Sequence, residues 1–107
     1  MATYTAEAIT VAGTVPTPRT AAAGDKLTPD TNAFIRVTNG GGSSMTITFA
    51  YPGVNADGEA NPDPQRTIAA GATKGILVSS RWADPADGLI ALTWSSTTSV
   101  TFTYERV

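Results

Sequence analysis

The chain of 107 residues carries a net charge of −2 and contains neither cysteine nor histidine. This length suits a single domain, and the missing residue types exclude disulfides, Ser-His-Asp and Cys-His nucleophilic sites, and zinc sites built on cysteine or histidine. The seven basic residues are scattered singly, so no positive stripe for nucleic acid is expected. No apolar run reaches the roughly 18 residues of a membrane span and the N-terminus lacks signal-peptide features, so we expect a soluble chain made in the cytoplasm.

Residues 1–32 are expected to form an extended arm, because this segment holds several prolines, glycines and alanines and few large apolar residues. The stretch 7–11 is its strand candidate, with Ile9 and Val11 on a shared face. Two interpretations stay open. The strand either completes a sheet of its own domain, or it adds to an exposed sheet edge of a neighbouring molecule and helps to fasten the domain there.

Residues 33–107 are expected to form the main β domain, in which two pairs of strands stand out. Alternating apolar residues over 33–39 and over 45–49 flank a glycine-rich turn, which predicts a β-hairpin. The same pattern predicts a second hairpin from 89–95 and 100–106, joined by a turn at 96–99. Trp94 lies in phase with the apolar residues of its strand, so it is expected in the core.

The segment between these pairs is predicted to contain a long polar loop, two shorter strands and a compact connection. The loop covers 51–65, the strands cover 67–69 and 73–78, and the connection covers 81–88 with one helical turn. Short strands joined by glycine and proline turns predict an all-β fold. We expect a small, single-domain antiparallel β-sandwich or barrel, with the extended N-terminal arm described above.

No candidate for a catalytic, cofactor-binding or metal-ligating residue is retained, and we expect no enzymatic activity. The most site-like stretch is 55–63, where oxygen donors stand at alternate positions as in a calcium loop. Gly58 comes too early for the EF-hand pattern and no glutamate closes the loop, so a solvated surface loop is favoured. Trp82 lies beside Arg81 in the connection, where it either closes the open end of the sandwich or anchors a partner.

Several segments together give the chain a layout similar to that of a known family. They are the opening strand at 4–11, the run 32–42 (NAFIRVTNGGG), the turn at 69–71, and above all 81–84 (RWAD), which leads through Asp87 and Gly88 into the last pair of strands. In this layout the chain resembles the small head decoration proteins, or capsid cement proteins, of tailed bacteriophages, particularly those of actinobacterial hosts. The loop at 51–65 has no counterpart in the pattern.

The resemblance implies a β-sandwich or β-tulip-like barrel on the outer capsid surface. Such a structural virion protein binds the major capsid protein and stabilises contacts between its subunits. The resemblance also implies self-association as a homotrimer, while the composition argues against nucleic-acid and membrane partners. Tyr4, Ile9, Val11, Arg81 and Trp82 are the residues that we assign to the interface. Two alternatives stay open: another virion module, such as a tail-tube, connector or fibre protein, and a bacterial surface-binding β domain with a protein or carbohydrate ligand.

Overall fold

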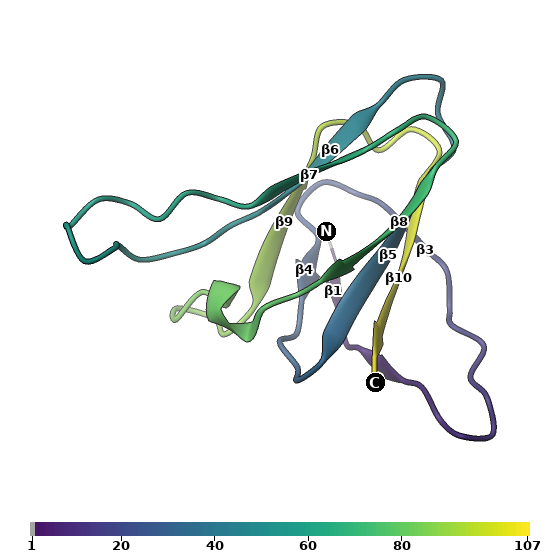
Figure 1. The fold of residues 1–107 in the computed structure, drawn as a ribbon, viewed down its shortest axis with the longest axis horizontal. Coiled ribbons are helices and arrows are strands. Elements are labelled where there is room, and N and C mark those ends of the chain that lie inside the picture. The colour runs from purple at the N-terminus through teal and green to yellow at the C-terminus, as the bar shows by residue number, and fades with distance from the viewer. Residues whose placement is uncertain (1) are drawn as a thin grey trace.

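Two β-sheets packed face to face make up the computed structural model, which describes residues 2–107 (Figure 1). The first sheet has the strand order β1-β4-β9-β6-β7, and its strands are β1 (Thr3–Tyr4), β4 (Lys26–Leu27), β9 (Ile90–Trp94), β6 (Met45–Phe49) and β7 (Gln65–Ile68). The second sheet has the order β2-β10-β5-β8, with β3 also paired to β10, and its strands are β2 (Glu7–Ala8), β10 (Val100–Arg106), β5 (Ala33–Asn39), β8 (Thr73–Leu77) and β3 (Arg19–Thr20). The all-β prediction is confirmed. Neither sheet closes into a barrel, so the fold is the two-sheet sandwich. Both sheets are mixed and not purely antiparallel as predicted, because β1 and β2 each run parallel to a neighbouring strand.

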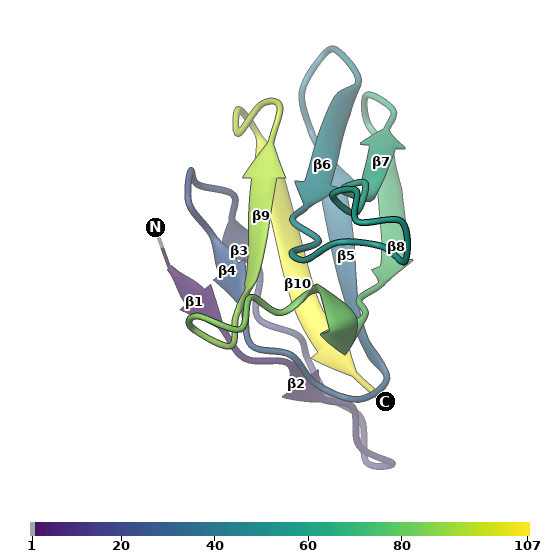
Figure 2. The same ribbon diagram turned by 90° about the vertical axis from the view of Figure 1, so that its left-hand side faces the viewer.

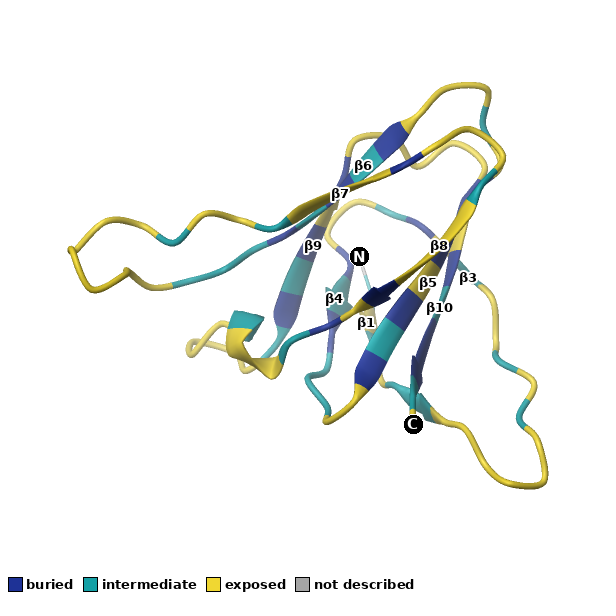
Figure 3. Ribbon diagram, in the orientation of Figure 1, coloured by how far each residue is buried: buried dark blue, intermediate teal, exposed yellow. Residues whose placement is uncertain are grey.

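The core lies between the sheets and consists of alternate residues of the longer strands (Figure 3). This alternation arises because successive residues of a strand point to opposite faces of its sheet. Trp94 of the first sheet and Phe102 of the second meet across the core, with ring centroids 5.4 Å apart. The predicted core position of Trp94 is therefore confirmed. The other large buried side chains come from strands of both sheets: Leu27, Met45, Ile47, Phe49, Ile68, Ile90 and Leu92 from the first, and Ile35, Val37, Ile76, Val100 and Tyr104 from the second.

Both predicted hairpins are wrong, although their four strands lie where the sequence pattern places them. β5 pairs with β10 and β8, whereas β6 pairs with β7 and β9, so the glycine-rich turn carries the chain from one sheet to the other. β9 and β10 likewise belong to different sheets. A period of two shows which face of a strand is buried. Two strands that face each other across a core carry the same pattern as two strands that are hydrogen-bonded neighbours.

A buried asparagine supports the crossing from β5 to β6. The Nδ2 group of Asn39 donates hydrogen bonds to the carbonyl oxygens of Ser43 (2.8 Å) and Ile68 (3.1 Å). Its Oδ1 accepts the backbone N–H of Gly41 at 3.0 Å. The Asn39 side chain is fully buried, so these bonds satisfy polar groups that water does not reach. These three bonds hold the conformation of the turn that carries the chain from β5 in one sheet to β6 in the other.

The remaining elements differ from the prediction by one or two residues. β7 covers Gln65–Ile68 and β8 ends at Leu77. The connection contains the expected helical turn as a short 3-10 helix, η1 (Ser80–Trp82), whose N-cap Ser79 accepts the N–H of Arg81 through its Oγ at 3.2 Å. No helix within residues 2–107 is long and apolar enough to cross a membrane.

Residues 2–32 pair with both sheets of their own chain (Figure 2). β1 runs parallel to β4, β2 runs parallel to the end of β10, and β3 pairs antiparallel with the start of β10. The strand predicted over 7–11 is limited to Glu7–Ala8, and Ile9 and Val11 share no buried face. The chain turns there, with Gly13 at a φ of 96° and its N–H bonded to the carbonyl of Thr10. Pairing within the chain is therefore present, and a role of this segment in attachment stays a prediction.

Candidate functional site

The five residues assigned to the interface lie in three separate places: β1, the loop after β2, and η1. Tyr4 of β1 is packed within its own chain. Its ring meets that of Phe102 edge to face at 5.1 Å, and the guanidinium of Arg19 lies 5.3 Å from its centroid. Tyr4 thus holds β1 against the core, and this packing accounts for its half-buried side chain.

Ile9 and Val11 lie in the N-terminal loop, residues 9–18, which projects from the sandwich after β2 (Figures 1 and 3). The exposed fractions are 45% for Ile9, 110% for Val11 and 92% for Val15. Three of the six large hydrophobic side chains that are exposed within residues 2–107 therefore belong to this one loop. Three exposed aliphatic side chains on one projecting loop make this loop a candidate for protein contact. Val15 was not assigned to the interface from the sequence, although a large aliphatic residue among threonines and prolines is a signal that could have identified it.

Hydrogen bonds hold the N-terminal loop in a defined shape. At its base, the carboxylate of Glu7 accepts the backbone N–H of Thr17 at 2.9 Å and its hydroxyl at 3.1 Å. Nearer the tip, Oγ1 of Thr14 accepts the N–H of Thr10 at 3.0 Å and donates to the carbonyl of Ala8 at 3.1 Å. A loop that is already shaped loses less conformational entropy when it binds a partner.

Trp82 closes one end of the core. Its half-buried ring lies against Phe49, with centroids 4.8 Å apart, whereas Arg81 beside it is exposed. The first interpretation of Trp82 is confirmed, and anchoring of a partner by its exposed part stays a prediction. The same connection is tied to β4 by the ion pair of Lys26 with Asp87. The hydrogen bond between them raises the pKa of Lys26 and lowers the pKa of Asp87.

The long loop, residues 50–64, joins β6 to β7 and uses its polar side chains to shape itself. Oδ1 of Asn55 accepts the N–H groups of Asp57 (3.0 Å) and Glu59 (3.1 Å), and Oδ1 of Asp63 accepts the N–H of Tyr51 at 2.9 Å. Within residues 2–107, no three acidic side chains gather closely enough to hold a metal ion. The contacts present are those by which Asn and Asp side chains stabilise turns.

Asp25 is fully buried, and the sequence had not indicated this burial. Its Oδ2 accepts the Nε1–H of Trp94 at 3.2 Å and the backbone N–H of Ala22 at 2.9 Å. Its Oδ1 has no hydrogen-bond partner within the described residues. Asp25 follows Gly24 in a stretch with turn composition, so an exposed position was the natural expectation. Its burial depends on a tryptophan that stands 69 residues later in the chain.

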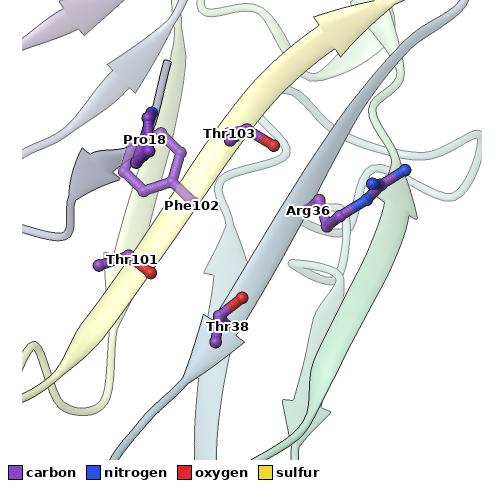
Figure 4. Close-up of a pocket in the computed structure, with 6 residues that line it drawn as sticks. All are labelled: Pro18, Arg36, Thr38, Thr101, Phe102 and Thr103. Carbon is purple, nitrogen blue, oxygen red and sulfur yellow. The ribbon is translucent and has the colours of Figure 1, made fainter. Parts of the chain in front are cut away.

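The outer face of the second sheet carries a row of threonines. Thr73, Thr38 and Thr101 are register partners across β8, β5 and β10, and Thr20 of β3 continues the row. A shallow depression of about 180 Å³ lies in this face, below the roughly 300–1,000 Å³ of usual small-molecule sites, so we assign it no ligand. Figure 4 shows the residues that line it, with Arg36 extending away from the others: Pro18, Arg36, Thr38, Thr101, Phe102 and Thr103.

Comparison of the chain with models of protein families, with curated proteins and with solved structures finds no match. The function must therefore be inferred from the layout of the sequence and from the surfaces that the fold exposes.

Proposed function

We propose that this protein decorates the outer surface of a tailed-bacteriophage capsid and stabilises contacts between major capsid subunits. The observation that carries the proposal is the exposure of aliphatic side chains on two projecting loops: Ile9, Val11 and Val15 on the N-terminal loop and Val54 on the long loop. The layout of the sequence, which resembles that of head decoration proteins nearly end to end, supports the same function.

The two loops leave the sandwich in different directions (Figure 1). A domain with two such contact sites can touch two neighbouring subunits at once, as a capsid-stabilising protein must. Moving a fully exposed valine into an interface stabilises the complex by about 1.5 kcal/mol or more. Self-association as a homotrimer belongs to the proposal, because several loops presented together bind more firmly than one.

Sedimentation with phage heads tests this function. Purified protein is mixed with expanded heads that lack any decoration protein, and we expect it to sediment with them at a saturable ratio. A double variant, Val11→Ser with Val15→Ser, should bind roughly tenfold more weakly or worse, because it loses two apolar contacts. The matched control is Val107→Ser, which alters a valine that is 76% exposed outside both loops and should leave binding unchanged.

Failure of the wild-type protein to bind heads would contradict the proposal. Binding to purified tails or to bacterial cell walls in the same assay would instead support one of the two alternatives, another virion module or a surface-binding domain. If the double variant bound heads as well as the control, capsid binding would stand but the N-terminal loop would have no part in it.

A further inference from the structure

The edge strands on one side of the sandwich, β7 and β8, differ in how their free backbone groups are used (Figure 2). In β7, the backbone groups of Gln65 and Thr67 point away from β6, because the ladder with β6 uses the residues on either side of them. The carbonyl of Gln65 accepts a hydrogen bond from Nη1 of Arg66 at 2.7 Å, and that of Thr67 accepts one from Nζ of Lys74 at 2.6 Å. Basic side chains therefore cap the two outward carbonyl groups of the β7 edge.

The β8 edge has no such cap. At one end of the ladder with β5, the carbonyl of Ala72 accepts the N–H of Asn39 at 2.9 Å, and at the other end the N–H of Val78 donates to the carbonyl of Ala33 at 3.0 Å. The even-numbered residues of this segment therefore bond to β5. The backbone N–H and C=O groups of Thr73, Gly75 and Leu77 consequently point away from β5. All three residues are exposed, and their backbone groups meet no partner within residues 2–107. A strand edge in this condition is a template for pairing with another chain.

The inner side of this edge is basic, and its outer face is mixed, because Arg36, the register partner of Gly75, places its guanidinium 5.7 Å from the ring centroid of Phe34 there. No acidic residue occurs in 64–83, and the two ion pairs within residues 2–107 involve neither Arg66 nor Lys74. Lys74 is in phase with the inward-facing residues of β8, so its charge lies at the open side between the two sheets. On the outer face, Leu77 is 77% exposed beside its register partner, the half-buried Phe34.

We propose that the β8 edge binds an extended acidic segment of a partner protein as an added β-strand. The main chain of the segment would pair with the outward N–H and C=O groups of Thr73, Gly75 and Leu77. Its alternate carboxylates would face Lys74 and Arg66, and the residues between them would lie on the outer face beside Leu77. The Lys74 ammonium carries three donors, so it can keep its bond to the β7 carbonyl and still bind a carboxylate.

A second copy of the chain fits this edge less well. Two β8 strands paired antiparallel about Gly75 would satisfy the same backbone groups. They would also bring two copies each of Lys74 and Arg66 to one side of the joint, with no acidic residue of the edge segment between them. Like charges placed together on paired strands are destabilising, whereas an acidic strand neutralises them.

Peptide binding tests the inference on the purified chain and does not depend on capsid attachment. The probe is a fluorescein-labelled peptide of sequence TEVEVEVET, and the control peptide TKVKVKVKT replaces each glutamate with lysine. Fluorescence anisotropy should show binding of the acidic peptide only. Gly75→Pro removes one outward N–H and should weaken binding roughly tenfold. A Cβ at Gly75 would meet nothing within 4 Å and that N–H takes no part in the β5 ladder, so we expect the variant to fold.

Two matched substitutions separate backbone and charge effects. Gly75→Ala keeps the N–H and should bind like the wild type. Lys74→Gln should weaken binding of the acidic peptide, whereas Arg106→Gln, which removes a charge from the end of β10, should not. Equal affinity for the two peptides, or equal affinity of Gly75→Pro and wild type with circular dichroism showing both folded, would overturn the proposal. Self-association of the chain that Gly75→Pro abolishes would overturn it as well, because it would identify a second copy as the occupant.

Discussion

The N-terminal third of the chain, residues 2–32, and the remainder, residues 33–107, reach the same two sheets by different means. In the remainder, strands of four to seven residues bury alternate apolar side chains between the sheets. In the N-terminal third each strand has only two residues, and just two hydrophobic side chains are buried, Ala21 and Leu27. The apolar burial that stabilises the remainder is therefore small in the N-terminal third.

Individual polar contacts stabilise the N-terminal third, which buries few apolar side chains. Asp25 accepts hydrogen bonds from Trp94 and from its own segment, and the hydroxyl of Tyr104 donates to the carbonyl of Thr28 at 2.7 Å. The bonds from Trp94 and Tyr104 join the N-terminal third to residues of long strands. A segment with little core of its own can thus become part of a fold, provided that its buried polar groups find partners there.

Deletion of residues 2–12 is the strongest challenge to this comparison, and we expect the truncated chain to unfold or aggregate. The deletion removes β1 and β2, so it uncovers the edges of β4 and β10 and the ring of Phe102. Far-UV circular dichroism and gel filtration measure the outcome, with Val11→Ser as a control that leaves both strands in place. Normal folding with weakened capsid binding would instead make the segment an external clamp.

Trp94→Ala should lower the free energy of unfolding by about 3–5 kcal/mol, because it leaves a large cavity and removes a partner of Asp25. Urea denaturation measures this loss. Trp82→Ala should have a smaller effect, since the Trp82 side chain is half-buried at the end of the core. Equal losses of unfolding free energy in the two variants would show that packing at the end of the sandwich contributes as much stability as packing at its centre.

Asp25→Ala should lower the free energy of unfolding by about 1–3 kcal/mol, because two buried N–H groups lose their acceptor. Asp25→Asn keeps one acceptor oxygen, so its effect should be smaller. Equilibrium denaturation of the three proteins gives the comparison. If both variants were as stable as the wild type, the N-terminal third would be held by something other than this carboxylate.

Tyr104→Phe should lower stability by about 1 kcal/mol at neutral pH, through loss of the bond to Thr28. Burial, helped by the negative charge of Asp30, raises the pKa of Tyr104 to about 12. Because the unfolded chain has a tyrosine pKa near 10, this stabilisation is fully present below about pH 10 and is lost as the pH rises towards about 12. The gap between wild type and variant should therefore narrow above pH 10 in denaturation curves measured at several pH values.

The smallest effect is expected from calcium, which should change the melting temperature by less than about one degree, since the acidic residues of the long loop form no closed ligand set. Differential scanning fluorimetry with calcium or EDTA measures it. A rise of several degrees would make Asp57, Glu59 and Asp63 ligands.

The candidate site was predictable only in part. Ile9 and Val11 could be chosen because they are large aliphatics in a stretch with no core of its own, and both are exposed. Tyr4 has the same local context and is instead packed against Phe102, which stands 98 residues later. The open edge of β8 could not be foreseen, because a strand becomes an edge only when the order of all the strands is settled.

The sequence by itself determines where the long strands lie and which of their side chains are buried, because alternation is a property of neighbouring residues. Tertiary structure alone decides how those strands are paired. A short glycine-rich turn can lead to a hydrogen-bonded neighbour about 4.8 Å away or to the opposite sheet about 10 Å away. Here the chain takes the second course. Asn39 binds the carbonyls of Ser43 in the turn and of Ile68 at the end of β7, and Trp94 binds Asp25, so contacts between distant residues accompany the crossing.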